Sequence, residues 1–473
     1  MSARDGLIAR LTGIVGEANV LIDAGDVAGY RTDGRGEGDG VPLAVVRPVD
    51  ADAVSALIHL AAERGVRIVV QGARTGLAGA GLASEDGGCL IVNLDRLSRH
   101  IAIDPENRTA TVDAGVRLSA LNAAAAEHGL FFPIDLGADP AIGGMIAANT
   151  GGSRLLRYGD VRSNLLSLDF VRADAEGASM TLGAPLWKNN TGLDLKQLLV
   201  GSAGSMGIVT RATLALQPLP RHRITAMIAL REPAFALPLL LALERDFGTL
   251  LSAFEGMSGP AYAAALEHVP GLRSPFANIP NYVVLVELSA GAVLDEALLE
   301  EWLAVDLEPY MDGDGAPVID VAIDHRDGLW AIRHAVPEGL RASGTVIACD
   351  IALRRGDMMR FRDDMAGRLK AEAPMLVPHD FGHIGDGGLH YNLVWPSAAG
   401  PVDRTVVERT RSLIFDAVVR EYGGSFSAEH GIGPRNIAHY PRFVPAPVRQ
   451  LAGALQQLVA PVPLGRVDFG MME

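Results

Sequence analysis

The sequence predicts an α+β protein of two or three domains. The chain has 473 residues, 49% of them hydrophobic. A domain usually takes ~100–200 residues, so this length allows more than one large core. Segments with helical spacing of apolar residues and short strand-like runs both occur along the chain. The 54 glycines indicate many tight turns.

Charge and cysteine content narrow the class of protein. Asp and Glu outnumber Lys and Arg by 56 to 41, giving a formal net charge of -15, which disfavours sequence-independent nucleic-acid binding. Two cysteines, Cys89 and Cys349, are too few for a disulfide framework or a thiolate metal site, so we expect a cytoplasmic protein. No window reaches the ~20 apolar residues of a membrane span.

The first 220 residues are expected to form one domain of strands and helices. Apolar residues at helical spacing predict helices at residues 51–66 and 117–129. Apolar runs bounded by turn residues predict strands at residues 66–70, 89–97, 108–116, 165–177 and 207–220.

A second domain, at residues 221–425, is predicted to be an α+β domain with an antiparallel sheet, a type of sheet that needs only short connections between its strands. The last residues, 426–473, are expected to return to the first domain. The strands expected in the second domain are residues 223–230, 281–288 and 345–353, and the helices are residues 233–247, 294–305, 355–372 and 402–424.

The stretch QGARTGLAGAG, residues 71–81, follows an expected strand. A phosphate-binding P-loop would need a lysine, and a dinucleotide fingerprint would need to open a helix. Neither condition holds, so this loop is expected to join two strands. Two interpretations remain: an anion-binding nest for a pyrophosphate, or an ordinary glycine-rich hairpin.

Two further glycine-rich stretches favour a ligand. Residues 133–159, PIDLGADPAIGGMIAANTGGSRLLRYG, are too rich in glycine to form a helix unsupported. We expect this backbone to pack closely against a large flat ligand. The third stretch is LKQLLVGSAGSMGIVT, residues 195–210.

Histidines gather in two glycine-rich motifs, HIGDGGLH at residues 383–390 and SAEHGIG at residues 427–433. If the first motif is a turn between two strands, His390 shares a face with Asn392, and His383 lies across the turn. Two imidazoles and the Glu429 carboxylate would leave one coordination position open, as in catalytic zinc sites. The alternative is that these histidines are hydrogen-bonded turn and core residues. Three histidines and a glutamate in two such motifs favour the metal site.

The three glycine-rich stretches resemble those of the vanillyl-alcohol oxidase and p-cresol methylhydroxylase family of FAD enzymes, in order and in spacing. The resemblance implies a two-subdomain FAD-binding domain of that type. No histidine lies in the first loop, so we expect non-covalent FAD. The residues implied in cofactor binding are Arg74, Thr75, Gly76, Leu77, Ala78, Gly79, Gly143, Gly144, Asn149, Gly151, Gly152, Tyr158, Gly159, Ile208 and Val209.

The motifs GHIGDGGLHYN and GGSFSAEHGIG, with KNNTGLDLKQLLVGS, resemble the D-2-hydroxyglutarate and D-lactate dehydrogenase branch of that family. There the paired motifs build a divalent-metal site over the flavin. The resemblance implies that His383, His390 and Glu429 hold the divalent metal, and we expect zinc because of this donor set. It also implies His430 as the base, Asn392 as a substrate contact and, in WAIRHAV, Arg333 as the substrate-carboxylate arginine.

The sequence departs from this branch at several positions. Ala348 stands where the branch usually has a lysine, which weakens the case for a second substrate carboxylate. Arg354 and Arg355 lie nearby and would either replace that charge or be solvated. Gly388 and Ala203 replace an expected Asn and Glu. The substrate side chain therefore stays open.

These observations predict a dehydrogenase that oxidises a D-2-hydroxy acid, such as 2-hydroxyglutarate or lactate, to the 2-oxo acid by hydride transfer to flavin N5. We expect a homodimer and an electron acceptor such as an electron-transfer flavoprotein or a quinone. Two alternatives remain. One is a non-redox transferase like alkyl-dihydroxyacetone-phosphate synthase, and the other is a degenerate FAD-binding subunit of a glycolate-oxidase-like complex.

Overall fold

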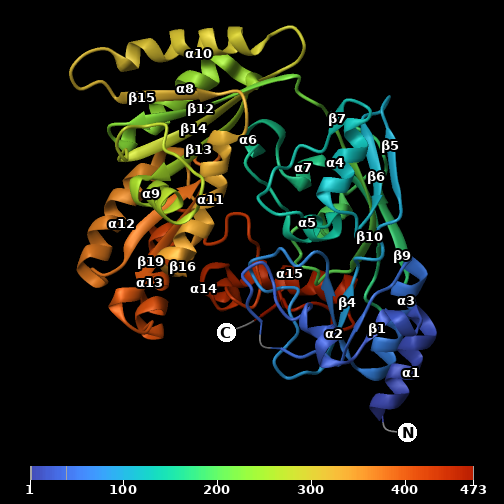
Figure 1. Ribbon diagram of the computed structural model, residues 1–473. Coiled ribbons are helices and arrows are strands. Elements are labelled where there is room, and N and C mark those ends of the chain that lie inside the picture. The colour runs from blue at the N-terminus through green and yellow to red at the C-terminus, as the bar shows by residue number, and fades with distance from the viewer. Residues whose placement is uncertain (1–2, 39, 472–473) are drawn as a thin grey trace. The chain divides into compact units, whose positions relative to one another are not determined.

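The computed structural model describes residues 3–38 and 40–471, which form two compact units (Figure 1). Unit 1 comprises the chain up to Thr150, Asp160–Leu219 and the segment from His430 onward. Unit 2 comprises Gly151–Gly159 and Pro220–Glu429. Helices and mainly antiparallel sheets occur in both units, which confirms the predicted α+β class.

Unit 1 contains two main sheets. The four-stranded sheet has the order β1-β2-β4-β3, in which β2, β4 and β3 are parallel. The five-stranded sheet, β5-β6-β10-β8-β9, is antiparallel throughout. The strands of unit 1 are β1 (Val20–Leu21), β2 (Ala44–Val46), β3 (Arg67–Gln71), β4 (Cys89–Asn93), β5 (Ile101–Asp104), β6 (Thr109–Asp113), β7 (Leu130–Phe131), β8 (Leu165–Val171), β9 (Ser179–Gly183), β10 (Ile208–Ala215) and β11 (Gln217–Pro218), of which β7 and β11 pair with each other.

Helix α3 begins and ends at ordinary sequence signals. Asp50 caps α3 because its side chain accepts a hydrogen bond from the Ala53 N–H, and Gly65 ends this helix in a left-handed conformation. The helices of unit 1 are α1 (Ala3–Val15), α2 (Ala24–Ala28), α3 (Ala51–Arg64), α4 (Leu118–Ala126), α5 (Ile142–Ala148), α7 (Val161–Asn164), α14 (Tyr440–Phe443) and α15 (Ala446–Val459). Every strand predicted for this unit is confirmed.

Unit 2 is built on one antiparallel sheet, ordered β15-β12-β14-β13-β18-β19-β16, with β17 also pairing with β19. Its strands are β12 (His222–Leu230), β13 (Leu251–Ser258), β14 (Tyr282–Ala290), β15 (Val318–Asp324), β16 (Gly344–Ile347), β17 (Asp350–Ala352), β18 (Val377–Gly382) and β19 (Gly388–Pro396). Its helices are α6 (Leu155–Tyr158), α8 (Ala236–Phe247), α9 (Gly259–His268), α10 (Glu296–Met311), α11 (Gly328–Ser343), α12 (Met358–Glu372) and α13 (Arg404–Asp416). Helices α9 and α11 share a hydrophobic core with one face of the sheet.

Residues 142–148 form the helix α5, which packs against β6 and β10, as expected of a stretch too rich in glycine to form a helix without support. Two expectations need correction. The strand expected at residues 345–353 is interrupted at Ala348 and Cys349, although β16 and β17 keep one register against β19. The helix expected at residues 402–424 changes at Ala417 to a π-helical turn that ends at Glu421.

Among the described residues, no helix is both long and apolar enough to cross a membrane.

Candidate metal and flavin sites

A tight turn between β18 and β19 positions the two predicted histidine ligands. His383 directly follows β18, and His390 lies within β19 opposite Phe381 of β18 and Asp350 of β17. Gly387 has φ 99°, and a Cβ there would come within 2.3 Å of the Leu353 carbonyl oxygen. The turn therefore requires glycine at this position.

The three predicted metal ligands converge on one carboxylate oxygen. Oε1 of Glu429 lies 3.6 Å from Nε2 of His383 and 3.4 Å from Nε2 of His390. The two imidazole rings meet edge to face, with centroids 5.4 Å apart. Two imidazole nitrogens and a carboxylate are a donor set that suits zinc and leaves a coordination position open. The residues present therefore fit a divalent cation.

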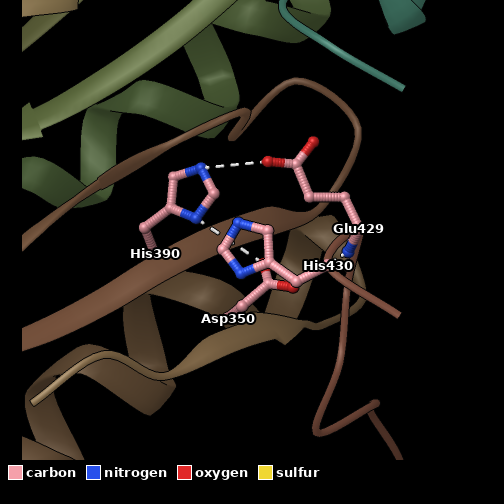
Figure 2. A group of neighbouring side chains, drawn as sticks. All are labelled: Asp350, His390, Glu429 and His430. Carbon is pink, nitrogen blue, oxygen red and sulfur yellow. Dashed lines mark hydrogen bonds and ion pairs between the residues drawn. The ribbon is translucent and has the colours of Figure 1, made fainter. Parts of the chain in front are cut away.

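Asp350, which was not predicted from the sequence, lies beside His390, Glu429 and His430. Ligand atoms of Asp350, His390, Glu429 and His430 all lie within 4.8 Å of one another. Figure 2 shows one nitrogen of His390 facing Glu429 and the other facing Asp350. The nitrogen facing Asp350 is Nδ1, at 3.5 Å, so a cation at Nε2 would leave Asp350 as a partner behind the ring.

Asp350 also fixes the backbone that carries Glu429. Its Oδ2 accepts hydrogen bonds from the N–H groups of Ala428 at 3.1 Å and Glu429 at 3.0 Å. This carboxylate thus supports two of the predicted ligands at once. His430 follows Glu429 directly in the chain, and its position in the cluster depends on the same anchored segment.

Glu255 of β13 is a second carboxylate that sequence reasoning missed. Its Oε1 lies 2.6 Å from Nδ1 of His383, and its Oε2 lies 2.8 Å from Nε and 2.7 Å from Nη2 of Arg333. Burial alone would raise the pKa of Glu255, but the charges of His383 and Arg333 and their hydrogen bonds lower it to about 2. Glu255 is therefore ionised at neutral pH.

The contacts of His383 with Glu255 and Glu429 change the pKa of His383. Burial alone would lower its pKa, but the carboxylates of Glu255 and Glu429 outweigh that effect and raise the pKa well above its usual value. A cation that binds at Nε2 must displace a proton, so metal binding to this ligand is favoured as the pH rises.

Arg333 and Asn392 are both buried in unit 2. Arg333 lies on α11, and its guanidinium carbon stands 4.7 Å from the centre of the Phe381 ring. Its Nε and Nη2 contact Glu255, which leaves Nη1 as the nitrogen for a second carboxylate. Asn392 shares the face of β19 with His390 by alternation and lies opposite His379.

The first glycine-rich loop fits an anion. It connects β3 to β4, which are parallel, so the hairpin interpretation is wrong. Arg74 and Gly79 have φ angles of 63° and 79°, in the left-handed region that also occurs in anion-binding turns. A Cβ at Gly76 would meet nothing within 4 Å, so a ligand can approach its backbone. Thr75, Leu77 and Ala78 lie in the same loop.

The second glycine-rich stretch is divided between the units. Gly143 packs against Ala114, whose Cβ would lie 2.9 Å from an added Cβ, whereas Gly144 faces open space. Asn149 ends α5 with φ 52°, and its side chain donates to Asp160 at 2.8 Å. These residues belong to unit 1, and the other predicted cofactor residues of this stretch belong to unit 2, namely Gly151, Gly152, Tyr158 and Gly159.

The last two predicted cofactor residues, Ile208 and Val209, belong to β10 and to the hydrophobic core of unit 1. Their side chains pack within this core, so a cofactor contact would fall to their backbone. An unpredicted feature is the anchoring of the segment before Gly159. Arg154 binds both oxygens of Glu287, at 2.8 and 2.9 Å, and Arg157 binds Ser289.

Comparison with protein families matches two regions of the chain. Residues 42–180 match the FAD binding domain. Residues 219–458 match the C-terminal domain of FAD linked oxidases, and this second match alone covers half of the chain. The chain belongs to the FAD-linked oxidases. This membership confirms the predicted superfamily and an FAD-binding domain in the N-terminal half.

Curated relatives of this FAD-linked oxidase are named D-2-hydroxyglutarate dehydrogenase. The protein of Xanthomonas citri pv. viticola is 35% identical, over 83% of this chain and 81% of its own. The mitochondrial enzyme of Arabidopsis thaliana is 32% identical, over 89% and 73%. The Stutzerimonas stutzeri protein is 30% identical, over 90% of each chain.

Solved structures confirm the fold. A p-cresol methylhydroxylase with bound substrate superimposes with a TM-score of 0.75 at 14% identity, covering 98% of this chain and 95% of that one. An alkyldihydroxyacetonephosphate synthase gives a TM-score of 0.70, also at 14% identity, covering 97% and 84%. The same fold therefore occurs in both the predicted family and the predicted non-redox alternative.

Proposed function

We propose that this chain is an FAD- and divalent-metal-dependent dehydrogenase that oxidises a D-2-hydroxy acid to the 2-oxo acid. The observation that carries the proposal is the convergence of His383, His390 and Glu429, with Arg333 linked to the same cluster through Glu255. Relatives named D-2-hydroxyglutarate dehydrogenase support it. The transferase alternative shares only the fold.

In this proposal, substrate binding and proton transfer are carried out by different side chains. Arg333 binds the substrate carboxylate through Nη1, and Asn392 contacts the substrate beside it. His430 accepts the hydroxyl proton while the Cα hydrogen leaves with its electron pair. When bound, FAD supplies the acceptor for that hydride, and a divalent cation at His383, His390 and Glu429 supplies Lewis-acid polarisation of the hydroxyl.

Several finer properties belong to the same proposal. Zinc suits the two-imidazole and one-carboxylate donor set. The FAD is non-covalent, because residues 71–81 contain neither histidine nor cysteine. A cytoplasmic homodimer that passes electrons to an electron-transfer flavoprotein or a quinone agrees with the sequence, although several relatives are named as mitochondrial.

Anaerobic mixing with substrate tests the function. We expect D-2-hydroxyglutarate or D-lactate to bleach the flavin absorbance of the purified protein, whereas the L-enantiomers leave it unchanged. The enantiomers are matched controls because they share charge, size and polarity. Bleaching by neither enantiomer, across a panel of 2-hydroxy acids, would contradict oxidation and favour the transferase or the degenerate subunit.

The substrate pocket is expected to accept acids without a second carboxylate. Arg354 is 75% exposed and pairs with Asp357, and Arg355 pairs with Glu244, so each already has an acidic partner. Neither arginine is therefore expected to replace the positive charge of the lysine that related proteins have at the position of Ala348. A charge-assisted hydrogen bond contributes ~1.5–3 kcal/mol, so its absence removes about tenfold or more of the preference for a diacid.

Comparison of kcat/KM for D-2-hydroxyglutarate and D-2-hydroxybutyrate measures this preference. Ala348→Lys should raise the ratio by about tenfold, and Ala348→Gln, which is long but uncharged, should not. A preference of the unmodified protein for the diacid of about a hundredfold, or ~2.7 kcal/mol, would contradict the prediction.

A further inference from the structure

Glu255 occupies a position that an apolar residue would ordinarily take. It lies in β13, whose eight residues are all buried, and its side chain is 1% exposed. A carboxylate so buried is costly unless it is paired. Its two oxygens have different partners, His383 at Oε1 and Arg333 at Oε2.

The contact at Oε1 determines which nitrogen of His383 can bind a cation. Arg333 donates to Oε2 through Nε and Nη2, which holds the carboxyl group of Glu255 as an acceptor, so Nδ1 of His383 carries the hydrogen of the 2.6 Å contact with Oε1. The free electron pair of the neutral ring is then on Nε2, the nitrogen that faces Glu429 at 3.6 Å. Glu255 therefore selects the tautomer in which His383 is a ligand.

The contact at Oε2 determines how Arg333 presents its guanidinium. Nε and Nη2 both point to Oε2, while the guanidinium plane lies over the ring of Phe381. This arrangement fixes the plane and leaves Nη1 for an incoming carboxylate. The negative charge of Glu255 also neutralises Arg333, which would otherwise repel a cation held by the adjacent His383.

We propose that Glu255 is a positioning residue that orients the ligand His383 and the substrate-binding Arg333 together. The proposal rests on the metal and substrate roles proposed above. It predicts that one substitution weakens metal binding and substrate binding at the same time, although Glu255 touches neither metal nor substrate.

Glu287 offers a matched control in the same sheet. It lies in β14, the neighbour of β13, and is also 1% exposed at its side chain. Its partners are Arg154, Arg223, Trp330 and Ser252, and none of these is a predicted metal ligand. Loss of either glutamate disrupts a buried ion pair, but only Glu255 contacts a metal ligand.

The experiment compares Glu255→Gln with Glu287→Gln in FAD-loaded protein from which metal has been removed by a chelator. Zn²⁺ is titrated calorimetrically, and bound Co²⁺ is monitored by its visible spectrum. We expect Glu255→Gln to weaken Zn²⁺ binding by about 10–100-fold, because loss of a carboxylate that holds a metal-ligating histidine typically lowers metal affinity by that amount. The variant should also alter the spectrum of bound Co²⁺. Glu287→Gln should bind Zn²⁺ within about threefold of the unmodified protein, and KM for the D-2-hydroxy acid should rise only in Glu255→Gln.

Glu255→Asp provides a second variant if the glutamine variant does not fold. The shorter carboxylate retains the charge and should restore part of the Zn²⁺ affinity. Equal Zn²⁺ affinity in Glu255→Gln and the unmodified protein would overturn the inference, as would equal losses in Glu255→Gln and Glu287→Gln. Failure of the unmodified protein to bind Zn²⁺ or Co²⁺ would instead refute the proposed metal site itself.

Discussion

His390→Ala is expected to abolish metal binding and turnover together. This residue contributes Nε2 to the cluster 3.4 Å from Glu429, and its Nδ1 is held by Asp350 from the neighbouring strand. Lewis-acid polarisation is worth several kcal/mol at the transition state, so kcat/KM should fall about a thousandfold or more. The FAD content should not change, because His390 is not one of the predicted cofactor residues and lies in β19 of unit 2, away from them in sequence.

Metal analysis and flavin absorbance of the same sample measure both effects. His325→Ala is the matched control, because His325 also lies in unit 2 but is 47% exposed and pairs with Glu300. That variant should retain metal, flavin and turnover. Full activity of His390→Ala without metal would refute the assignment of this ligand.

Arg333→Ala is expected to reduce both substrate binding and stability. It removes the guanidinium that binds the substrate carboxylate, and it leaves Oε2 of the buried Glu255 without its cationic partner, with only His383 at Oε1. Removal of one member of a buried ion pair costs about 3–5 kcal/mol. Arg333→Lys should restore part of the stability but little of the substrate affinity, since an ammonium cannot replace the planar fork.

A double-mutant cycle separates the two effects. Arg333→Ala combined with Glu255→Ala removes both charges, so denaturant unfolding should show a smaller loss than the sum of the single variants. Turnover should stay low, because the substrate has no partner for its carboxylate. An additive loss of stability would show that the two side chains are not coupled.

The sequence predicted elements and motifs well, because both leave local patterns. Helical spacing located α3 and α8, and continuous apolar runs located β12 and β14. Glycine and histidine motifs located the residues of the turn after β18 and the segment around Glu429. Each motif is short, and its candidate metal-binding residues lie within a few positions of one another in the chain, so the motif can be recognised from the sequence alone.

The missed residues come from pairing between strands distant in sequence. Asp350 and Glu255 are single carboxylates in apolar strands, and they reach the histidines only because β13, β18, β19 and β17 are neighbours in one sheet. No spacing rule predicts that order. The available signal was the lone acidic residue in LSAFEGMS, because a buried charge requires a partner.

Stopped-flow reduction of the flavin most directly tests the central claim that a metal-dependent site oxidises a D-2-hydroxy acid. Chelator-treated protein that retains FAD is mixed anaerobically with the D-acid after addition of increasing Zn²⁺. We expect negligible reduction without metal and a rate that rises until about one equivalent of Zn²⁺ per chain is bound. Rapid reduction of the metal-free protein, unchanged by added Zn²⁺, would contradict it.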